Sequence, residues 1–143
     1  MNDPSIRIKL NNVTKRFGIG DAEISALDNV DLTVKKGEFI AIMGPSGCGK
    51  TTLLNMIGLL DQPSDGEYYL DNRPVDFLTP RQRAQIRSKQ IGFIFQNFNL
   101  VPRLTVIDNV ALPLTYTGLG KIKRLQEASR ILKTFHLNER EYY

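Results

Sequence analysis

Residues 44–52 read GPSGCGKTT, which matches the phosphate-binding pattern G-x-x-x-x-G-K-[ST]. At ordinary amino-acid frequencies, the odds of a chance match in a chain of 143 residues are on the order of one in two hundred. The run before the motif, EFIAIM at 38–43, is apolar and typical of a buried strand, and the run after it, LLNMI at 53–57, continues as a helix. Strand, glycine-rich loop and helix is the order that a phosphate-binding loop (P-loop) requires, so the motif predicts a site for nucleotide phosphates.

The residue types in this loop suit the binding of an anion. Glycines let the backbone curl so that successive N–H groups point inward, and the helix that begins near Lys50 adds its positive end. Lys50 is predicted to reach the β- and γ-phosphates, Thr51 to place its hydroxyl on Mg²⁺, and Thr52 to donate toward the inner phosphates. The alternative is a glycine-rich turn with a structural role only. The predicted nucleotide contacts are Gly44, Ser46, Gly47, Cys48, Gly49, Lys50, Thr51 and Thr52.

The composition indicates one ordinary globular domain. Hydrophobic residues make up 41% of the chain and charged residues 24%, which is close to the average for soluble proteins. No apolar run approaches the ~18 residues that a membrane-spanning helix needs, and the first residues lack the layout of a signal peptide, so we expect a cytosolic protein. The single cysteine, Cys48, excludes an intrachain disulfide and fills a variable position of the loop.

The charge pattern does not call for a nucleic-acid partner. The net charge is +4, from 19 basic and 15 acidic residues. Basic residues gather in two runs, at 81–89 and 121–133, but no aromatic residues are interleaved with them, as a platform for single-stranded nucleic acid would require. We therefore interpret both runs as solvated helix faces and expect no nucleic-acid partner.

Hydrophobic periodicity predicts a β-rich beginning and a helical end. Alternation of apolar and polar residues indicates strands at 6–10 and 25–34, and the second turns through 35–37 into the strand at 38–43. Next come a helix from Lys50 that stops at 61–66 and a hairpin at 67–75. A helix capped by Thr79 and Gln82 follows, and then a buried strand at 91–95. The chain ends with two more helices, the first of which starts at Thr105 and Asp108 and ends or kinks at Pro113. The helix from Lys50 is expected to bury Leu53, Leu54, Ile57 and Leu60, and the last helix to bury Leu125, Ala128, Leu132 and Phe135.

Several segments besides the P-loop carry a family resemblance. They are VTKRF at 13–17, LDNVDL at 27–32, GEF at 37–39 and GFIFQ at 92–96. With these segments, the chain resembles the N-terminal half of an ATP-binding cassette (ABC) transporter ATPase nearly from end to end. The segment NFNLVPRLTVIDNV at 97–110 is similar to the branch that serves lipoprotein release, macrolide export and related peptide export, although Asp108 stands where that branch more often has Glu.

The resemblance implies a fold and a division of the chain. The expected fold class is α/β: a partial P-loop NTPase core with an N-terminal antiparallel β subdomain and the start of a helical subdomain. Residues 1–143 then form a partial ABC ATPase domain. The β subdomain begins at 1–37, the P-loop core with its Q-loop occupies 38–96, and the helical subdomain, which touches the membrane partner in this family, begins at 97–143.

Two residues outside the P-loop acquire roles from the resemblance. Phe17 matches the aromatic residue that stacks on the adenine ring, an interaction worth about 1–3 kcal/mol that tolerates any base. The alternative for Phe17 is a place in the core. Gln96 matches the Q-loop glutamine, whose amide oxygen reaches Mg²⁺ and the region of the attacking water. Lys50 and Gln96 are thus the predicted catalytic residues, and Thr51 and Gln96 the predicted metal ligands.

Three motifs that hydrolysis requires in this family do not occur in the 143 residues. They are an apolar strand ending in an Asp–Glu pair, the signature loop Leu-Ser-Gly-Gly-Gln, and a switch histidine. The single histidine, His136, precedes the place of the signature loop, is expected on a helix surface, and is given no catalytic role. Because positioning of the nucleophile is most of phosphoryl-transfer catalysis, the chain is expected to bind ATP and Mg²⁺ weakly and not to hydrolyse ATP by itself.

We therefore hypothesise a truncated ABC ATPase whose parent couples ATP hydrolysis to transport, bound to transmembrane permease subunits at the inner, cytoplasmic face of the cell membrane. Apolar strand edges are expected to be exposed, so the chain should be weakly stable or should pair with another copy, as in a homodimer. One alternative is a non-catalytic nucleotide-binding or regulatory interaction module. Another is a kinase or GTPase, but the chain lacks the Asn-Lys-x-Asp base-recognition motif, and Phe17 and Gln96 would go unexplained.

Overall fold

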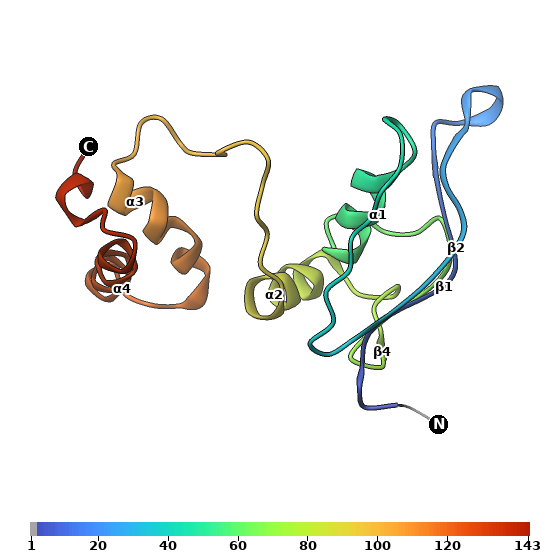
Figure 1. The fold of residues 1–143 in the computed structure, drawn as a ribbon, viewed down its shortest axis with the longest axis horizontal. Coiled ribbons are helices and arrows are strands. Elements are labelled where there is room, and N and C mark those ends of the chain that lie inside the picture. The colour runs from blue at the N-terminus through green and yellow to red at the C-terminus, as the bar shows by residue number, and fades with distance from the viewer. Residues whose placement is uncertain (1–2) are drawn as a thin grey trace. The chain divides into compact units, whose positions relative to one another are not determined.

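The chain divides into two units, which we describe separately. The computed structural model describes residues 3–143, apart from the side chain of Asp21. The first unit is Met1–Ile91 and the second is Gly92–Tyr143 (Figure 1). The division predicted from the family resemblance, after residues 37 and 96, stays a prediction.

An antiparallel sheet forms one side of the first unit. Its strands are β1 (Ile6–Phe17), β2 (Ile24–Lys35), β3 (Asp65–Leu70) and β4 (Arg73–Pro74), in the spatial order β2-β1-β3-β4. The predicted strands at 6–10 and 25–34 and the predicted hairpin at 67–75 are therefore confirmed, but β1 continues beyond its predicted end at Leu10 to Phe17. Between β3 and β4, Asp71 and Asn72 both have positive φ, 49° and 60°. A two-residue turn of this kind matches the right-handed twist of the paired strands, which explains why an Asp-Asn pair connects them.

Helix α1 (Lys50–Ile57) packs its buried side chains, Leu53 and Met56, against the sheet. The core around it includes Leu10, Val13 and Tyr68, all fully buried. The helix was predicted from Lys50, and this start is confirmed. It ends before the predicted turn residues 61–66, because Gly58 closes its last turn.

Part of the predicted apolar face of α1 is wrong. Leu54 and Leu60 are about half exposed, whereas Met56, which was not predicted, is fully buried. For Leu60 the cause is the early end of the helix: Leu59 adopts a positive φ of 57°, so the residues after it no longer follow helical periodicity. Leu54 lies within α1, and the early end of the helix does not explain its exposure.

Helix α2 (Pro80–Gln90) begins as predicted, with a complete capping box. The backbone N–H of Gln82 donates to Thr79 Oγ1 at 3.3 Å, and the N–H of Thr79 donates to Gln82 Oε1 at 2.9 Å. At the other end of the helix, Arg87 donates to the carbonyl of Leu59 at 2.8 Å, which fixes α2 to the turn that follows α1.

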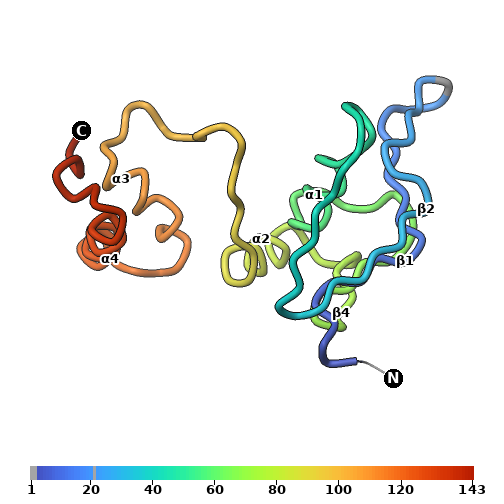
Figure 2. The backbone as a smooth tube through the Cα atoms, viewed as in Figure 1, coloured from blue at the N-terminus to red at the C-terminus, as the bar shows by residue number. Residues whose placement is uncertain are grey.

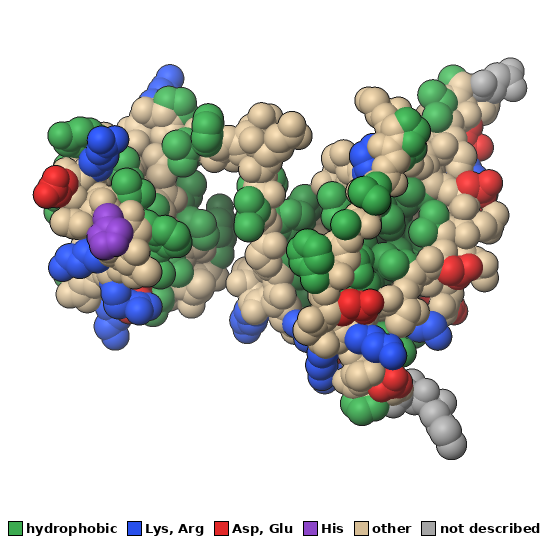
Figure 3. Space-filling view, viewed as in Figure 1, with side chains coloured by type: hydrophobic (Ala, Val, Ile, Leu, Met, Phe, Trp, Pro, Cys, Tyr) green, Lys and Arg blue, Asp and Glu red, His purple; other side chains and the backbone are tan. Residues whose placement is uncertain are grey.

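The two predicted buried strands, at 38–43 and 91–95, are wrong. Neither segment pairs with a strand among residues 3–143. Figure 2 shows 38–43 as extended backbone between the end of β2 and the P-loop. Phe39, Met43 and Ile94 are almost fully exposed, and hydrophobic side chains lie open on the surface of the first unit (Figure 3). The physical reason is that an apolar run becomes a strand only when a neighbouring strand satisfies its N–H and C=O groups, and the described residues provide no such neighbour.

The second unit is helical and has a small core of its own. It contains α3 (Val106–Ala111), α4 (Lys121–Thr134) and the 3₁₀ segments η2 (Leu112–Thr117) and η3 (Asn138–Arg140); the remaining 3₁₀ turn, η1 (Gly20–Ala22), joins β1 and β2 in the first unit. The core of the second unit consists of Ile107, Ala111, Ala128 and Leu132, with Val106, Val110 and Leu125 packed against it. The predicted cap at Thr105 is confirmed, since its hydroxyl accepts from the N–H of Asp108 at 3.3 Å. α3 ends at Ala111, just before the predicted break at Pro113.

Two expectations for the end of α4 are wrong. Phe135 is largely exposed, because the helix ends at Thr134 and Phe135 caps it. His136 lies in the turn after the helix, with a φ of 57°, and not on a helix surface. Within the described part of the chain, no helix combines the length and the apolar character needed to cross a membrane.

Replacing Tyr68 by Phe is expected to destabilise the first unit by about 1–2 kcal/mol, because it leaves the partly buried carbonyl of Ile57 without this donor. The side chain of Tyr68 is 1% exposed, and its hydroxyl donates to the carbonyl of Ile57, the last residue of α1, at 2.7 Å. Burial also raises the pKa of this hydroxyl, so it stays a donor at every ordinary pH. Urea unfolding measures the change. Tyr69→Phe is the control, since that neighbouring ring is only partly buried; equal losses in the two variants would contradict the account.

Candidate functional site

The P-loop is pressed against the edge of the β1–β2 hairpin at Gly49. This residue has a φ of 87° and occupies the N-cap of α1. A Cβ atom placed on it would lie 2.3 Å from the carbonyl oxygen of Ala26 and 3.1 Å from Leu27 Cδ2, both on β2. Glycine is therefore required at this position for two reasons, the backbone conformation and the close approach of another strand.

The side chain of Lys50 folds back over the loop. Its ammonium donates to the carbonyl of Gly44 at 2.9 Å and to that of Pro45 at 2.5 Å, and it lies 3.6 Å from Cys48 Sγ. The positive charge is thus held inside the curve of the loop. Cys48 itself is exposed.

The beginning of α1 completes a site that suits an anion. The first N–H groups of a helix have no intrahelical acceptor, and here they belong to Lys50, Thr51 and Thr52. The first turn of α1, all of it described, holds no acidic residue that would compete for them. Free N–H groups, the helix dipole and the Lys50 ammonium therefore act in the same direction, toward binding phosphate.

The donor set fits Mg²⁺ only in company with phosphate oxygens. Among the described residues, no group of three or more His, Cys, Asp or Glu side chains could hold a metal ion. Thr51 lies in the first turn of α1 and is exposed, so its hydroxyl is free to serve as one oxygen ligand. Mg²⁺ commonly takes one or two protein ligands and completes its shell with phosphate oxygens and waters, so Thr51 fits the role predicted for it.

Phe17 is the last residue of β1. It is 47% exposed, so it is not a core residue. Two residues earlier on the same strand, Lys15 pairs in register with Leu27, and Leu27 is the residue that a Cβ on Gly49 would touch. The aromatic ring and the phosphate loop are therefore attached to the same stretch of the hairpin.

Lys15 is a site residue that the sequence reasoning missed. Its ammonium lies 5.0 Å from the centroid of the Phe17 ring. The available signal was the period of the strand, because residues i and i+2 point to the same face and Lys15 precedes Phe17 by two.

Gln96 belongs to the second unit and is exposed. The geometry of the first unit, which holds the P-loop and Phe17, does not test the role predicted for Gln96. Its contact with Mg²⁺ and the attacking water stays a prediction.

Comparison with known proteins gives consistent matches. The sequence model described as ABC transporter matches residues 27–142. The uncharacterized ABC transporter ATP-binding protein MJ0796 of Methanocaldococcus jannaschii is 48% identical over 136 residues, which cover 93% of this chain and 58% of that protein. The macrolide export ATP-binding/permease protein MacB of Rhodopirellula baltica is 44% identical over 135 residues, covering 93% of this chain and 20% of that protein.

A solved structure agrees with the sequence matches. The dimeric structure of the ATP-binding cassette MJ0796 in a post-hydrolysis state, bound to ADP and Pi, aligns with a TM-score of 0.82 at 46% identity and covers 94% of this chain and 60% of that one. The resemblance and the α/β fold class inferred from the motifs are confirmed. The chain spans little more than half the length of MJ0796, 58%.

Alanine at Gly49 is expected to destabilise the first unit more than alanine at Gly47. Both residues have positive φ, so both substitutions add backbone strain of about 1–2 kcal/mol. Only at Gly49 does the new Cβ meet a backbone oxygen, since nothing lies within 4 Å at Gly47. The clash adds about 1–3 kcal/mol, to be measured as the difference in free energy of unfolding in urea. Equal free energies for the two variants would show that Gly49 does not approach β2 as described.

Proposed function

We propose a function on the premise that this chain belongs to the ABC transporter family. The chain is the ATP-binding part of an ABC transporter ATPase and binds ATP together with Mg²⁺. The observation that carries the proposal is the P-loop, where the Lys50 ammonium is held against the carbonyls of Gly44 and Pro45 at the beginning of α1. Binding of phosphate would exchange those carbonyl contacts for charge-assisted hydrogen bonds to phosphate oxygens.

Each end of the nucleotide has a proposed partner in the first unit. The phosphates bind the N–H groups of the loop and of the first turn of α1, with Lys50 at the β- and γ-phosphates. The adenine ring stacks on the exposed part of Phe17, which adds affinity with little base specificity. Thr51 holds Mg²⁺ through its hydroxyl, and we keep Gln96 as a second ligand whose amide reaches the region of the attacking water.

We propose that the 143-residue chain does not hydrolyse ATP by itself. Its sequence holds no apolar strand that ends in an Asp–Glu pair, no Leu-Ser-Gly-Gly-Gln loop and no histidine after such a loop. Without a group that orients the nucleophile, a bound triphosphate is held but not attacked. Hydrolysis coupled to transport belongs, in this proposal, to a longer protein of the same family.

The proposed partners are permease subunits and a second copy of the chain. MacB is named as an ATP-binding/permease protein, and two structures of MJ0796 are dimeric. The exposed apolar residues of the two unpaired segments, among them Phe39, Met43 and Ile94, support association with another polypeptide. Through the permease, the chain would lie at the inner face of the cell membrane, with its helical second unit toward the membrane partner.

A non-catalytic nucleotide-binding or regulatory module is the second candidate. It is favoured by the first unit's own buried core, in which Leu10, Val13, Met56 and Tyr68 are all 1% exposed or less. Sedimentation at increasing protein concentration distinguishes the two. A monomer that unfolds cooperatively supports the regulatory module, whereas concentration-dependent association supports the transporter component.

Lys50→Ala is expected to weaken binding of a fluorescent ATP analogue in the presence of Mg²⁺ by about 10- to 100-fold. This range corresponds to the loss of a charged hydrogen bond of about 1.5–3 kcal/mol. The matched control is Lys36→Ala, which removes an exposed lysine from the turn after β2. Equal affinity of the wild-type and Lys50→Ala proteins for the ATP analogue would contradict the proposed binding mode.

Steady-state phosphate release by the wild-type chain is expected to equal that of Lys50→Ala, because neither protein positions a nucleophile. Turnover that depends on Lys50 would overturn the proposal that the chain does not hydrolyse ATP by itself.

A further inference from the structure

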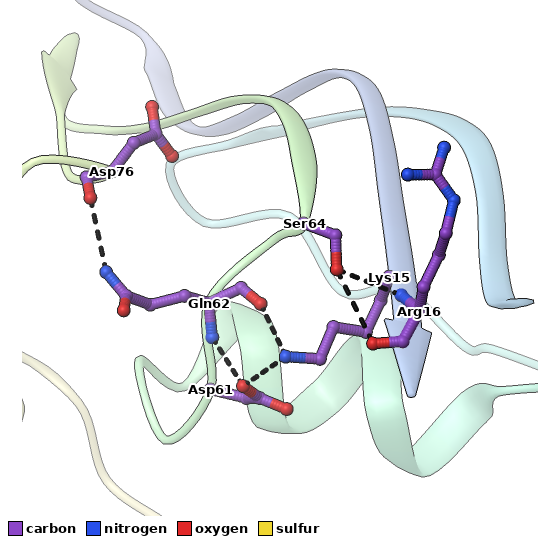
Figure 4. Close-up of polar contacts among 6 residues, drawn as sticks. All are labelled: Lys15, Arg16, Asp61, Gln62, Ser64 and Asp76. Atoms are coloured by element: carbon purple, nitrogen blue, oxygen red, sulfur yellow. Dashed lines mark hydrogen bonds and ion pairs between the residues drawn. The ribbon is translucent and has the colours of Figure 1, made fainter. Parts of the chain in front are cut away.

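Lys15 is fixed in place more firmly than a surface lysine. Its side chain is 13% exposed, and its ammonium donates to Asp61 Oδ1 at 2.6 Å and to the carbonyl of Gln62 at 2.9 Å (Figure 4). Asp61 is held in turn by the N–H of Gln62, at 2.7 Å. Burial raises the pKa of the Asp61 carboxyl, but the hydrogen bonds from Lys15 and Gln62 and the charges of Lys15 and Arg83 outweigh it, so this pKa is lowered and the carboxylate is ionised at neutral pH.

The segment that holds Lys15 is itself fixed to its surroundings. Ser64 accepts the N–H of Arg16 at 3.0 Å through its hydroxyl, and its own N–H donates to the carbonyl of Thr14 at 2.8 Å. The side-chain amide of Gln62 donates to the carbonyl of Asp76 at 3.2 Å (Figure 4). The acceptors of the Lys15 ammonium therefore have little freedom to move.

The same ammonium lies over the ring of Phe17. The distance of 5.0 Å from Nζ to the ring centroid is within the range of a cation–π interaction. Because the cation is anchored by two acceptors, it restricts the ring as well as attracting it. The ring stays 47% exposed, so surface is left for a second stacking partner.

This contact connects Phe17 to the helix that carries the P-loop. The N–H groups of Leu60 and Asp61 both donate to the carbonyl of Asn55 in α1, at 2.8 and 3.3 Å. A continuous set of contacts thus runs from the ring of Phe17 through Lys15 and Asp61 to α1, whose first turn is the phosphate site. The ring is thus connected to α1 through one cation–π contact, one ion pair and the backbone hydrogen bonds to Asn55.

We propose that Lys15 is a positioning residue for the base of the nucleotide: anchored by Asp61 and Gln62, it holds the Phe17 ring at a fixed distance from the P-loop. This inference rests on the proposed function, in which Phe17 stacks on adenine. Lys15 acts through Phe17 and contacts neither phosphate nor metal. Its removal therefore affects ligands that carry a base and spares ligands that do not.

The test compares ATP with inorganic tripolyphosphate as competitors of a ribose-labelled fluorescent ATP analogue, in Mg²⁺, on the 143-residue chain. Lys15→Met keeps the length of the side chain and removes its charge; we expect about fivefold weaker binding of ATP. Tripolyphosphate has no base, so its affinity is expected to stay within about twofold of wild type. Lys15→Arg restores the cation and is expected to restore ATP binding. Lys9→Met, at an exposed lysine on the same strand, is the matched control and is expected to change neither affinity.

A double substitution shows whether Lys15 acts through Phe17. Phe17→Ala is expected to weaken ATP binding selectively, and Lys15→Met on that background is expected to cause no further loss. Equal weakening of ATP and tripolyphosphate by Lys15→Met, or no weakening of either, overturns the proposal. If circular dichroism shows that Lys15→Met is unfolded, Asp61→Ala is used instead. It is also expected to weaken ATP binding and spare tripolyphosphate binding, and equal weakening of both ligands, or of neither, overturns the proposal.

The stacking of the base on Phe17 and the role of Lys15 can be disproved separately. If Phe17→Ala leaves ATP binding unchanged, the proposed stacking of the base is wrong, and the role of Lys15 falls with it. If Phe17→Ala weakens ATP binding selectively but Lys15→Met does not, only the inference on Lys15 is wrong.

Discussion

The close approach of Gly49 to the backbone of β2 fixes the P-loop to the sheet. A Cβ at this position would lie 2.3 Å from a backbone oxygen, so the loop can sit there only because the residue is glycine. From this contact, α1 packs along the sheet. At the C-terminal end of the helix, the hydroxyl of Tyr68 donates to the carbonyl of Ile57. Both ends of α1 are thereby tied to the antiparallel strands. The helix consequently serves as a rigid spacer between the phosphate site and the residues that follow it.

Much of the fold could be predicted because it depends on local rules. The capping box of Thr79 and Gln82, the cap at Thr105 and the start of α1 at Lys50 each need only a few neighbouring residues. Alternation of apolar and polar residues was sufficient for the first part of β1, up to Leu10, and for β2, since one face of each lies on the core.

The failures have two causes, partners that are distant in the sequence and helix ends that the apolar pattern does not mark. The apolar runs at 38–43 and 91–95 have the composition of strands, but strand pairing is supplied by a neighbour, and the described residues hold none. Leu60 and Phe135 were assigned to buried faces because the pattern did not show where each helix ends. In the candidate site, the P-loop could be predicted because its motif is contiguous in the sequence. Lys15 could not be predicted, because its partners Asp61 and Gln62 lie more than 40 residues away.

The proposed function depends on the first turn of α1 and on the free N–H groups of the loop before it. Hydrogen–deuterium exchange of the backbone amides of residues 46–52, with and without saturating Mg–ATP, tests this most directly, and the amides of α4 serve as the internal reference. We predict slower exchange in residues 46–52 when nucleotide is present and unchanged exchange in α4. Exchange in residues 46–52 that is the same with and without nucleotide would contradict the central claim.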